Sequence, residues 1–338
     1  MRTSESFPCL LGALLLAALL HGTSPAQATT VIKLGTLAPE GSSWITALRG
    51  IDAELRQATQ DQVQLKIYPG GVQGDEDVML RKMRIGQLQG AGLGGTAASF
   101  INPDVLAHQM PFLFDNNDEV DHVMAAMAAF YRDGFRAKGY ELLGWTDVGF
   151  VYLLSRNPVD DVDDLQGAKV WRLKDEPITG AVFGHAGVTS VPLGIPDVLL
   201  GLQTNLVDVV YAPPSAAIVL QWFTRVRYYT DMPINYANGA IVVLSSAFDA
   251  LTPAQQEHLR AISTRHIEAH NRRSRRDNAE ALELMLREGV RPVAVSAEAV
   301  AHFRSLVDRS LPDLVGRAFS RQAHDLVRQH LDELRTGP

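Results

Sequence analysis

One uninterrupted helical run near the end of the chain constrains the fold more than any other feature. Thr252-Pro253-Ala-Gln255 has the residues of a capping box, with proline at the first helical position. After Pro253, neither proline nor glycine occurs before Gly289. At 1.5 Å per residue, about 36 residues extend about 54 Å. A helix of this length is unusual, and we expect it to lie along two lobes of one protein.

The length and composition support the same division. The chain has 338 residues, of which 46% are hydrophobic, and a formal net charge of −7. These values are typical of a globular protein, and the length exceeds what one hydrophobic core usually supports. The mild acidity gives no general attraction to nucleic acid, so we expect no nucleic-acid partner.

The first 28 residues predict a secretory signal peptide. Arg2 lies near the start, an apolar run covers residues 9–20, and Ala26-Gln-Ala28 offers a small-residue cleavage site. We expect cleavage after Ala28 and a periplasmic location. Cleavage would remove Cys9, the single cysteine, and with it any disulfide or thiol nucleophile. Because no later apolar run approaches about 18 residues, we expect a mature protein that does not span a membrane.

Strands and helices alternate through the first half of the chain. The pattern predicts a strand over 31–37, a helix over 44–57 and a strand over 63–68. Such a βαβ unit should be parallel and right-handed. Further elements are expected as a helix over 118–138, two strands over 140–145 and 150–155, and a strand over 241–244 that returns the chain to the first lobe.

A second alternating stretch predicts a ligand-binding rim. Lys169–Leu173 and Val207–Tyr211 are β-prone, a leucine-spaced helical segment lies between them, and Pro213-Pro214 ends the second strand. Parallel strands in an open α/β sheet place their carboxyl ends at one rim, where ligands bind. We therefore expect Trp171, Arg172 and Tyr211 near that rim.

Signatures of catalysis are missing from the sequence. It contains no GxSxG, HExxH or P-loop lysine motif. Gly90, Gly92 and Gly95 have GxGxxG spacing, but a helix rather than a strand is predicted before them, so we expect a plain strand and loop. His266 and His270 share a helix face without a third ligand fixed by spacing. The pattern favours a binding protein over an enzyme, with no cofactor and no metal.

Several segments together carry a resemblance to a known family. They are 32–42, Pro111-Phe-Leu-Phe114, Leu165-Gln-Gly-Ala-Lys-Val170, and Val191-Pro-Leu193 followed by 202–208. In order and spacing, the chain resembles the periplasmic substrate-binding proteins of tripartite ATP-independent periplasmic (TRAP) transporters, the DctP-like family. The resemblance implies two α/β lobes joined by hinge strands, a long helix bridging both lobes, and closure around one small organic ligand. It also implies delivery to a membrane permease made of a small and a large subunit.

The resemblance completes the expected division of the chain. We expect a signal peptide over 1–28, the first part of lobe I over 29–149, lobe II over 150–239, and a return to lobe I over 240–338, which includes the bridging helix at about 253–288 and the C-terminal helices.

The ligand-binding residues depart from the family pattern. The position of the family's carboxylate-binding arginine matches Trp171, with Arg172 one residue later. An asparagine position matches Ala212 and an early histidine position matches Trp44. If these residues face the cleft, the ligand is more apolar than a C4-dicarboxylate or sugar acid; otherwise Trp171 and Trp44 pack in the core. The candidate ligand-binding residues are Trp44, Tyr152, Trp171, Arg172, Tyr211 and Asn235.

Three alternatives stay open at this point. The first is an ordinary organic-acid TRAP binding protein that uses Arg172, which requires a shift in strand register. The second is a periplasmic sensor or lipid carrier that uses the same cleft. The third is an exported hydrolase, for which His185 would have to meet a serine and a carboxylate.

Overall fold

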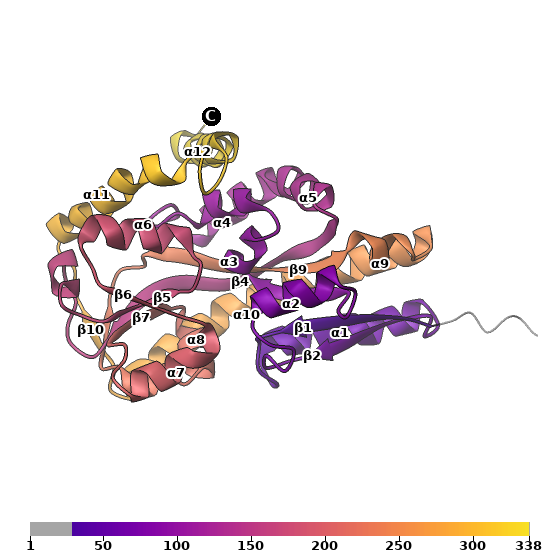
Figure 1. The fold of residues 1–338 in the computed structure, drawn as a ribbon, viewed down its shortest axis with the longest axis horizontal. Coiled ribbons are helices and arrows are strands. Elements are labelled where there is room, and N and C mark those ends of the chain that lie inside the picture. Colours follow the sequence, from indigo (N-terminus) through magenta and orange to yellow (C-terminus); the bar gives the residue numbers. More distant parts are fainter. Residues whose placement is uncertain (1–28, 338) are drawn as a thin grey trace, which may run out of the picture.

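The computed structural model describes residues 29–337, so the predicted signal peptide lies outside the described residues. Figure 1 shows an elongated α/β molecule with two lobes along its long axis. The predicted fold class is therefore confirmed. The exact lobe boundaries, placed after residues 149 and 239, stay predictions.

One continuous sheet path links the two lobes, in the order β2-β1-β3-β9-β4-β7-β5-β6. At one end β1 (Thr30–Thr36) pairs in parallel with β2 (Val63–Tyr68) and with β3 (Gly90–Gly94). At the other end β5 (Val170–Leu173) pairs in parallel with β6 (Ser190–Leu193) and β7 (Val209–Ala212). Outside the path, β8 (Tyr228–Thr230) pairs with β4 and with β10 (Arg291–Val293).

One connection between the lobes is a long strand, β4, and the prediction of two separate strands over its residues was wrong. β4 runs from Tyr140 to Ser155, with register shifts between Leu142 and Gly144 and between Asp147 and Gly149. Gly149 has a φ of 126°, which a side chain would disfavour, so the strand bulges there instead of ending. Most of β4 pairs with β9 (Asn235–Leu244), and its last four residues pair with β7.

The helices of lobe I form around apolar stripes. In α1 (Ser43–Ala58) the buried residues Ile45, Leu48, Ile51 and Leu55 follow helical spacing and face the sheet. The predicted helix over 118–138 is two helices, α4 (Asn117–Ala126) and α5 (Ala128–Ala137), which meet at Met127. The other elements before β4 are α2 (Glu76–Arg84), α3 (Gly95–Ser99) and η2 (Pro103–Gln109).

Lobe II has a separate core. Trp171, Val198, Leu202 and Trp222 belong to one buried cluster there. Its helices are short and lie on both faces of the strands: η3 (Val162–Leu165), α6 (Pro177–Ala186), α7 (Ile195–Gln203), α8 (Pro214–Val219) and η4 (Trp222–Arg225).

The bridging helix is confirmed as α10, 35 residues from Pro253 to Arg287. It follows the short α9 (Ser245–Asp249), and the side chain of Thr252 accepts a hydrogen bond from the Gln255 amide in the predicted capping box. α10 contacts α1 in lobe I, then β4, then α8 in lobe II (Figure 1). It therefore braces both lobes from one side.

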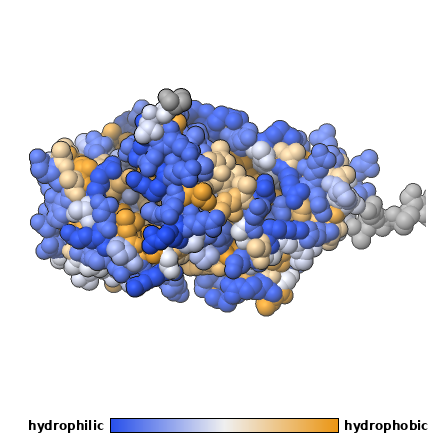
Figure 2. All heavy atoms as spheres, turned by 90° about the horizontal axis from the view of Figure 1, so that it is seen from above, coloured by the Kyte–Doolittle hydropathy of each residue, from blue (hydrophilic) through white to orange (hydrophobic). Residues whose placement is uncertain are grey.

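Two C-terminal helices cover the opposite side. α11 (Ala297–Leu314) packs on α6, and α12 (Arg321–Thr336) packs on α4 and η2. Seen from above these helices, the surface is largely hydrophilic and broken by small apolar areas (Figure 2). Within residues 29–337, no helix combines the length and the apolar character that a membrane crossing requires.

Candidate functional site

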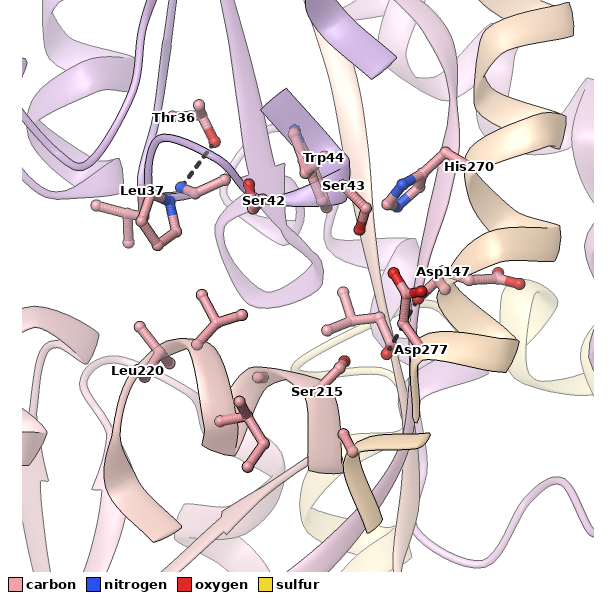
Figure 3. Close-up of a pocket in the computed structure, with 18 of the residues that line it drawn as sticks. Thr36, Leu37, Ser42, Ser43, Trp44, Asp147, Ser215, Leu220, His270 and Asp277 are labelled. Carbon is pink, nitrogen blue, oxygen red and sulfur yellow. Dashed lines mark hydrogen bonds between the residues drawn. The ribbon is translucent and has the colours of Figure 1, made fainter. Parts of the chain in front are cut away.

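A cavity of about 640 Å³ lies between the two lobes against α10 (Figure 3). Lobe I contributes the loop after β1 and the end of β3, β4 contributes Asp147 and Val148, and lobe II contributes α8. The cavity is thus lined by segments that are far apart in the sequence. Its volume is in the range of small-molecule sites, which is about 300–1,000 Å³.

Most of the cavity wall is apolar. The aliphatic residues that line it are Leu37, Ala38, Leu93, Val148, Ile195, Ala216, Ile218, Val219, Leu220, Ala281 and Leu284. They come from both lobes and from the brace. A wall of this kind favours a ligand that buries hydrocarbon surface.

Trp44 forms part of the lobe I wall and is held in a slot made by two glycines. A Cβ atom at Gly239 would lie 2.3 Å from Cη2 of Trp44, and one at Gly92 would lie 3.0 Å from its Nε1. The indole therefore lies against β3 and β9 where these strands have no side chains. The Ser42 hydroxyl caps α1 by accepting a hydrogen bond from the Ile45 amide, which fixes the start of the helix that carries Trp44.

His270 extends from α10 toward this tryptophan. The two rings meet edge to face, with centroids 5.8 Å apart. The residue is 6% exposed, and burial lowers the pKa of its imidazole, so the ring is uncharged at neutral pH. The backbones of Ser43 and Asp147 lie near it, but neither ring nitrogen has a hydrogen-bond partner of ordinary geometry among residues 29–337.

The carboxylate of Asp147 is paired with the guanidinium of Arg275 on α10. Nε of Arg275 donates to Oδ2 of Asp147 at 2.8 Å, and the same guanidinium binds Asp121. These carboxylates raise the pKa of Arg275. The Asp147 backbone amide also donates to Oδ1 of Asn271 at 2.9 Å. At Asp147, β4 is therefore anchored to α10 by an ion pair and by a hydrogen bond.

Asn278 links three elements at the same place. Its Nδ2 donates to the Val148 carbonyl at 2.7 Å, and its Oδ1 accepts from the Ser215 amide at 3.1 Å. One side chain on α10 thus ties the crossing of β4 to the start of α8.

Glu76 is a buried acid in the lobe I wall. Its Oε1 accepts a hydrogen bond from the Gly94 amide at 2.6 Å. Burial raises the pKa of this carboxyl to about 7, the neighbouring Asp75 and Asp77 add to the effect, and the Gly94 amide opposes it. Glu76 is therefore close to half-protonated at neutral pH.

The cavity-lining arginines have acidic neighbours on their own helix. Arg273 lies 3.6 Å from Asp277, and Arg287 lies 3.6 Å from Glu283, in both cases measured between a guanidinium nitrogen and a carboxylate oxygen. For each arginine, a carboxylate of the protein would therefore compete with a ligand carboxylate.

Of the six residues predicted from the sequence, Trp44 lines the cavity, and the other five lie elsewhere. Trp171 is 3% exposed and packs in the lobe II core against Tyr211, with ring centroids 4.6 Å apart, and against Trp222. Its Nε1 donates to the Leu193 carbonyl at 3.1 Å. Trp171 therefore packs in the core, which was the predicted alternative to a position in the cleft.

The remaining predicted residues make local contacts. Nε of Arg172 lies 3.4 Å from the Ser190 hydroxyl, and the Tyr211 hydroxyl accepts from the Leu173 amide at 3.1 Å. Tyr152 packs edge to face on Tyr229 at 5.9 Å. Asn235 accepts from the amide of its neighbour Tyr236.

The other histidines of interest have partners away from the cavity. Nε2 of His185 lies 2.9 Å from Asp313, and Nε2 of His266 lies 2.9 Å from Glu54. The i, i+4 spacing of His266 and His270 had marked both residues, but they point to different neighbours. Asp161, Asp163 and His302 form a group with metal-ligand spacing, and Asp161 also caps η3.

Sequence reasoning missed Asp147, His270 and Asn278 as residues around the cavity. Only His270 carried a signal, through its spacing from His266. The positions of the other two depend on how α10 lies against β4, which no local pattern encodes.

Comparison with known proteins gives a consistent match. The family model described as "Bacterial extracellular solute-binding protein, family 7" (DctP) matches residues 34–315. The 2,3-diketo-L-gulonate-binding periplasmic protein of Escherichia coli K12 is 23% identical over 253 residues, which cover 73% of this chain and 76% of that protein. The sialic acid-binding periplasmic protein of Vibrio cholerae is 22% identical over 277 residues, which cover 80% and 85%.

Solved structures share the fold. A TRAP periplasmic solute-binding protein from Xanthobacter autotrophicus with bound β-D-galacturonate has a TM-score of 0.83 at 16% identity, covering 89% of this chain and 99% of that one. One from Desulfovibrio salexigens with bound orotic acid has a TM-score of 0.83 at 17% identity, covering 91% and 99%.

Proposed function

Since the chain belongs to family 7 of the bacterial extracellular solute-binding proteins, the periplasmic binding proteins of TRAP transporters, we propose that it captures its ligand in the cavity against α10. The observation that carries this proposal is the cavity itself, which both lobes and α10 line and whose exposed wall is largely apolar. Delivery to a small and a large membrane subunit follows as part of the same proposal. So do export to the periplasm and removal of residues 1–28.

We further propose that the ligand is more apolar than a C4-dicarboxylate. The aliphatic wall supports this, and so do the acidic neighbours of Arg273 and Arg287. The position that matches the family's arginine holds Trp171, which is buried in the lobe II core. Similar proteins are bound to anions such as galacturonate and orotic acid, so this chain would differ from them in ligand charge.

One observation favours an organic-acid ligand instead. Among the described residues, the Ser190 hydroxyl is the hydrogen-bond partner of Arg172 at 3.4 Å. Burial raises the pKa of the nearby Glu176 carboxyl, and the positive charge of Arg172 acts against this larger effect. A movement of β5 or α6 could offer this guanidinium to a carboxylate, the group that arginine binds best.

Ligand identification separates the two candidates. The protein is purified from its own periplasm without denaturation, and the co-purified compound is identified by native mass spectrometry and extraction. Calorimetric titrations with succinate, malate and galacturonate follow, on the wild type and on Arg172→Ala. We expect an apolar compound and no micromolar binding of the three acids. Micromolar binding of malate that is lost in Arg172→Ala would contradict the apolar ligand and establish the second candidate.

A further inference from the structure

The imidazole of His270 is a buried polar group without a structural partner. It is 6% exposed, it lines the cavity, and neither of its nitrogens makes a hydrogen bond of ordinary geometry within residues 29–337. Figure 3 shows the ring directed from α10 toward Ser43. Native structures rarely leave buried polar atoms unpaired, so such an atom at a cavity wall points to a partner that comes from outside the chain.

A second buried histidine shows how this protein satisfies a structural imidazole. His108 is 1% exposed, and its Nδ1 lies 2.9 Å from the Tyr131 hydroxyl. Its Nε2 lies 2.7 Å from Nδ2 of Asn238. Both nitrogens of His108 are therefore paired inside the protein, whereas neither nitrogen of His270, a residue of the cavity wall, has a partner within residues 29–337.

The charges around His270 restrict what can bind there. Asp147 and Asp277 line the same part of the cavity (Figure 3). Asp147 is paired with Arg275, and Asp277 has Arg273 beside it. A ligand carboxylate would meet these two acids, and the arginines in the described part of the cavity wall, Arg273 and Arg287, already have acidic neighbours, so a charged acid is disfavoured. An ammonium group would find one acceptor on the imidazole, and the two carboxylates beside it are already paired with Arg273 and Arg275.

The chemistry of an uncharged imidazole matches a hydroxyl group. The ring presents one N–H donor and one nitrogen acceptor, and a hydroxyl both donates and accepts. Trp44 covers one edge of the ring, and the aliphatic wall continues along α8. The two features together offer a polar end and an apolar body to one ligand.

Resting on the proposed capture of an organic ligand in this cavity, we propose that His270 binds a hydroxyl group of that ligand. The ligand class is an uncharged, hydroxylated molecule with an apolar body, such as a cyclic or aromatic alcohol. His270 then determines specificity by rejecting the corresponding acid.

The test is a matched panel in three chemical forms. Cyclohexyl, phenyl and linear six-carbon skeletons are each offered as the alcohol, the carboxylate and the amine, and dissociation constants are measured by calorimetry. We expect the dissociation constant of at least one alcohol to be about tenfold lower, or lower still, than those of the acid and the amine with the same skeleton. One good hydrogen bond gives a difference of about this size. His270→Leu should remove that preference, and His270→Gln, which keeps a donor and an acceptor, should restore part of it.

Two controls make the outcome specific. Thermal melting shows whether each variant is folded. When the alcohol binds, the ring ¹⁵N signals of His270 should shift and those of His108 should stay fixed. A purely structural role of His270 would not produce this shift. Unchanged alcohol affinity in His270→Leu, tighter binding of the acids, or binding by none of the alcohols overturns the inference.

Failure of the inference is distinguishable from failure of the proposed function. If acids bind and Ala216→Trp, which fills the cavity, abolishes their binding, the cavity is the ligand site and only the hydroxyl assignment fails. If Ala216→Trp leaves the binding of every ligand unchanged, the proposed site itself is wrong.

Discussion

Gly239 shows how one residue fixes the position of a cavity wall. A Cβ atom there would lie 2.3 Å from Trp44 and 2.6 Å from the Leu93 carbonyl, which belongs to the backbone and cannot rotate away. We expect Gly239→Ala to lower the free energy of unfolding by about 2 kcal/mol or more through overpacking. Urea unfolding measures the change. The control is Gly184→Ala in α6, where nothing lies within 4 Å of the added atom.

That control should behave in the opposite way. Replacing glycine by alanine inside a helix stabilises it by up to about 1 kcal/mol. Equal stability of Gly239→Ala and the wild type would contradict the slot described for Trp44.

Glu76 predicts an unusual dependence of stability on pH. The pKa of its carboxyl is about 7 in the folded protein and near 4.5 in the unfolded chain, so the folded state holds more protons between these values. The contribution of Glu76 to stability is therefore greatest at low pH and declines as the pH rises to about 7. Relative to Glu76→Gln, we expect the wild type to lose about 2–3 kcal/mol between pH 5 and pH 8.

Urea unfolding of both proteins at the two pH values measures this difference. The glutamine keeps an oxygen that can accept from the Gly94 amide, so the comparison isolates the ionisation. Parallel stability curves for the two proteins would show that the carboxyl titrates normally.

The sequence predicted Trp44 at the cavity but could not place Trp171. Trp44 was predicted because it matches an early histidine position of the resembled family, and it lies in the first turn of α1. Both faces of β5 are buried, so its sequence lacks the alternation of polar and apolar residues that would show which face Trp171 occupies. Only the packing of η4 and β7 against β5 determined which face Trp171 occupies.

At the scale of elements, Asn278 couples α10 to β4 at Val148 and to the start of α8. Its replacement by alanine leaves the Val148 carbonyl and the Ser215 amide without their partner. We expect Asn278→Ala to destabilise the protein by about 1–3 kcal/mol, the usual effect of leaving buried polar groups unpaired. Hydrogen exchange should accelerate in 146–149 and 213–219.

The matched control lies on the same helix. The side chain of Glu283 is 72% exposed, and its pairing with Arg287 at 3.6 Å is a surface contact. Glu283→Ala should leave exchange in both segments unchanged. If the two variants accelerate exchange equally, Asn278 has no special role in joining α10 to β4 and α8.

The start of α10 offers a second test at this scale. Thr252 caps the helix by accepting from the Gln255 amide, and the Gln255 side chain accepts from the Thr252 amide. We expect Thr252→Ala to lower the free energy of unfolding by about 1 kcal/mol and Thr252→Ser to lower it less. Thermal or urea unfolding compares the two. Equal stability of all three proteins would show that packing alone holds this helix end.

The predicted helices and strands were correct where the periodicity of the sequence was strong. They were wrong where a helix break or a strand bulge has no clear signal in the sequence. The capping box and the absence of proline and glycine predicted α10 nearly to the residue. The break at Met127 carries no proline or glycine, so it could not be seen. β4 was divided in two because Thr146-Asp-Val-Gly149 resembles a turn, although here the strand continues through a register shift between Asp147 and Gly149.

At the scale of the whole molecule, the cavity predicts a change of shape on binding. Its walls belong to both lobes, so a ligand that contacts both favours their approach. We expect the compound that co-purifies with the protein to reduce the radius of gyration in small-angle X-ray scattering. Ala216→Trp, with its cavity filled, should show no further reduction when the compound is added. An unchanged radius for the wild type at saturation would contradict closure by the ligand.

The pairing of β3 also has a consequence for how the chain is made. One edge of β3 meets β1, but the other meets β9, and residues 95–234 are synthesised between them. A nascent chain therefore carries an apolar sheet with an open edge until β9 emerges, and such edges are prone to pair with other chains. The N-terminal half should depend on chaperones while translation continues, and fragments that stop before Asn235 should aggregate instead of folding.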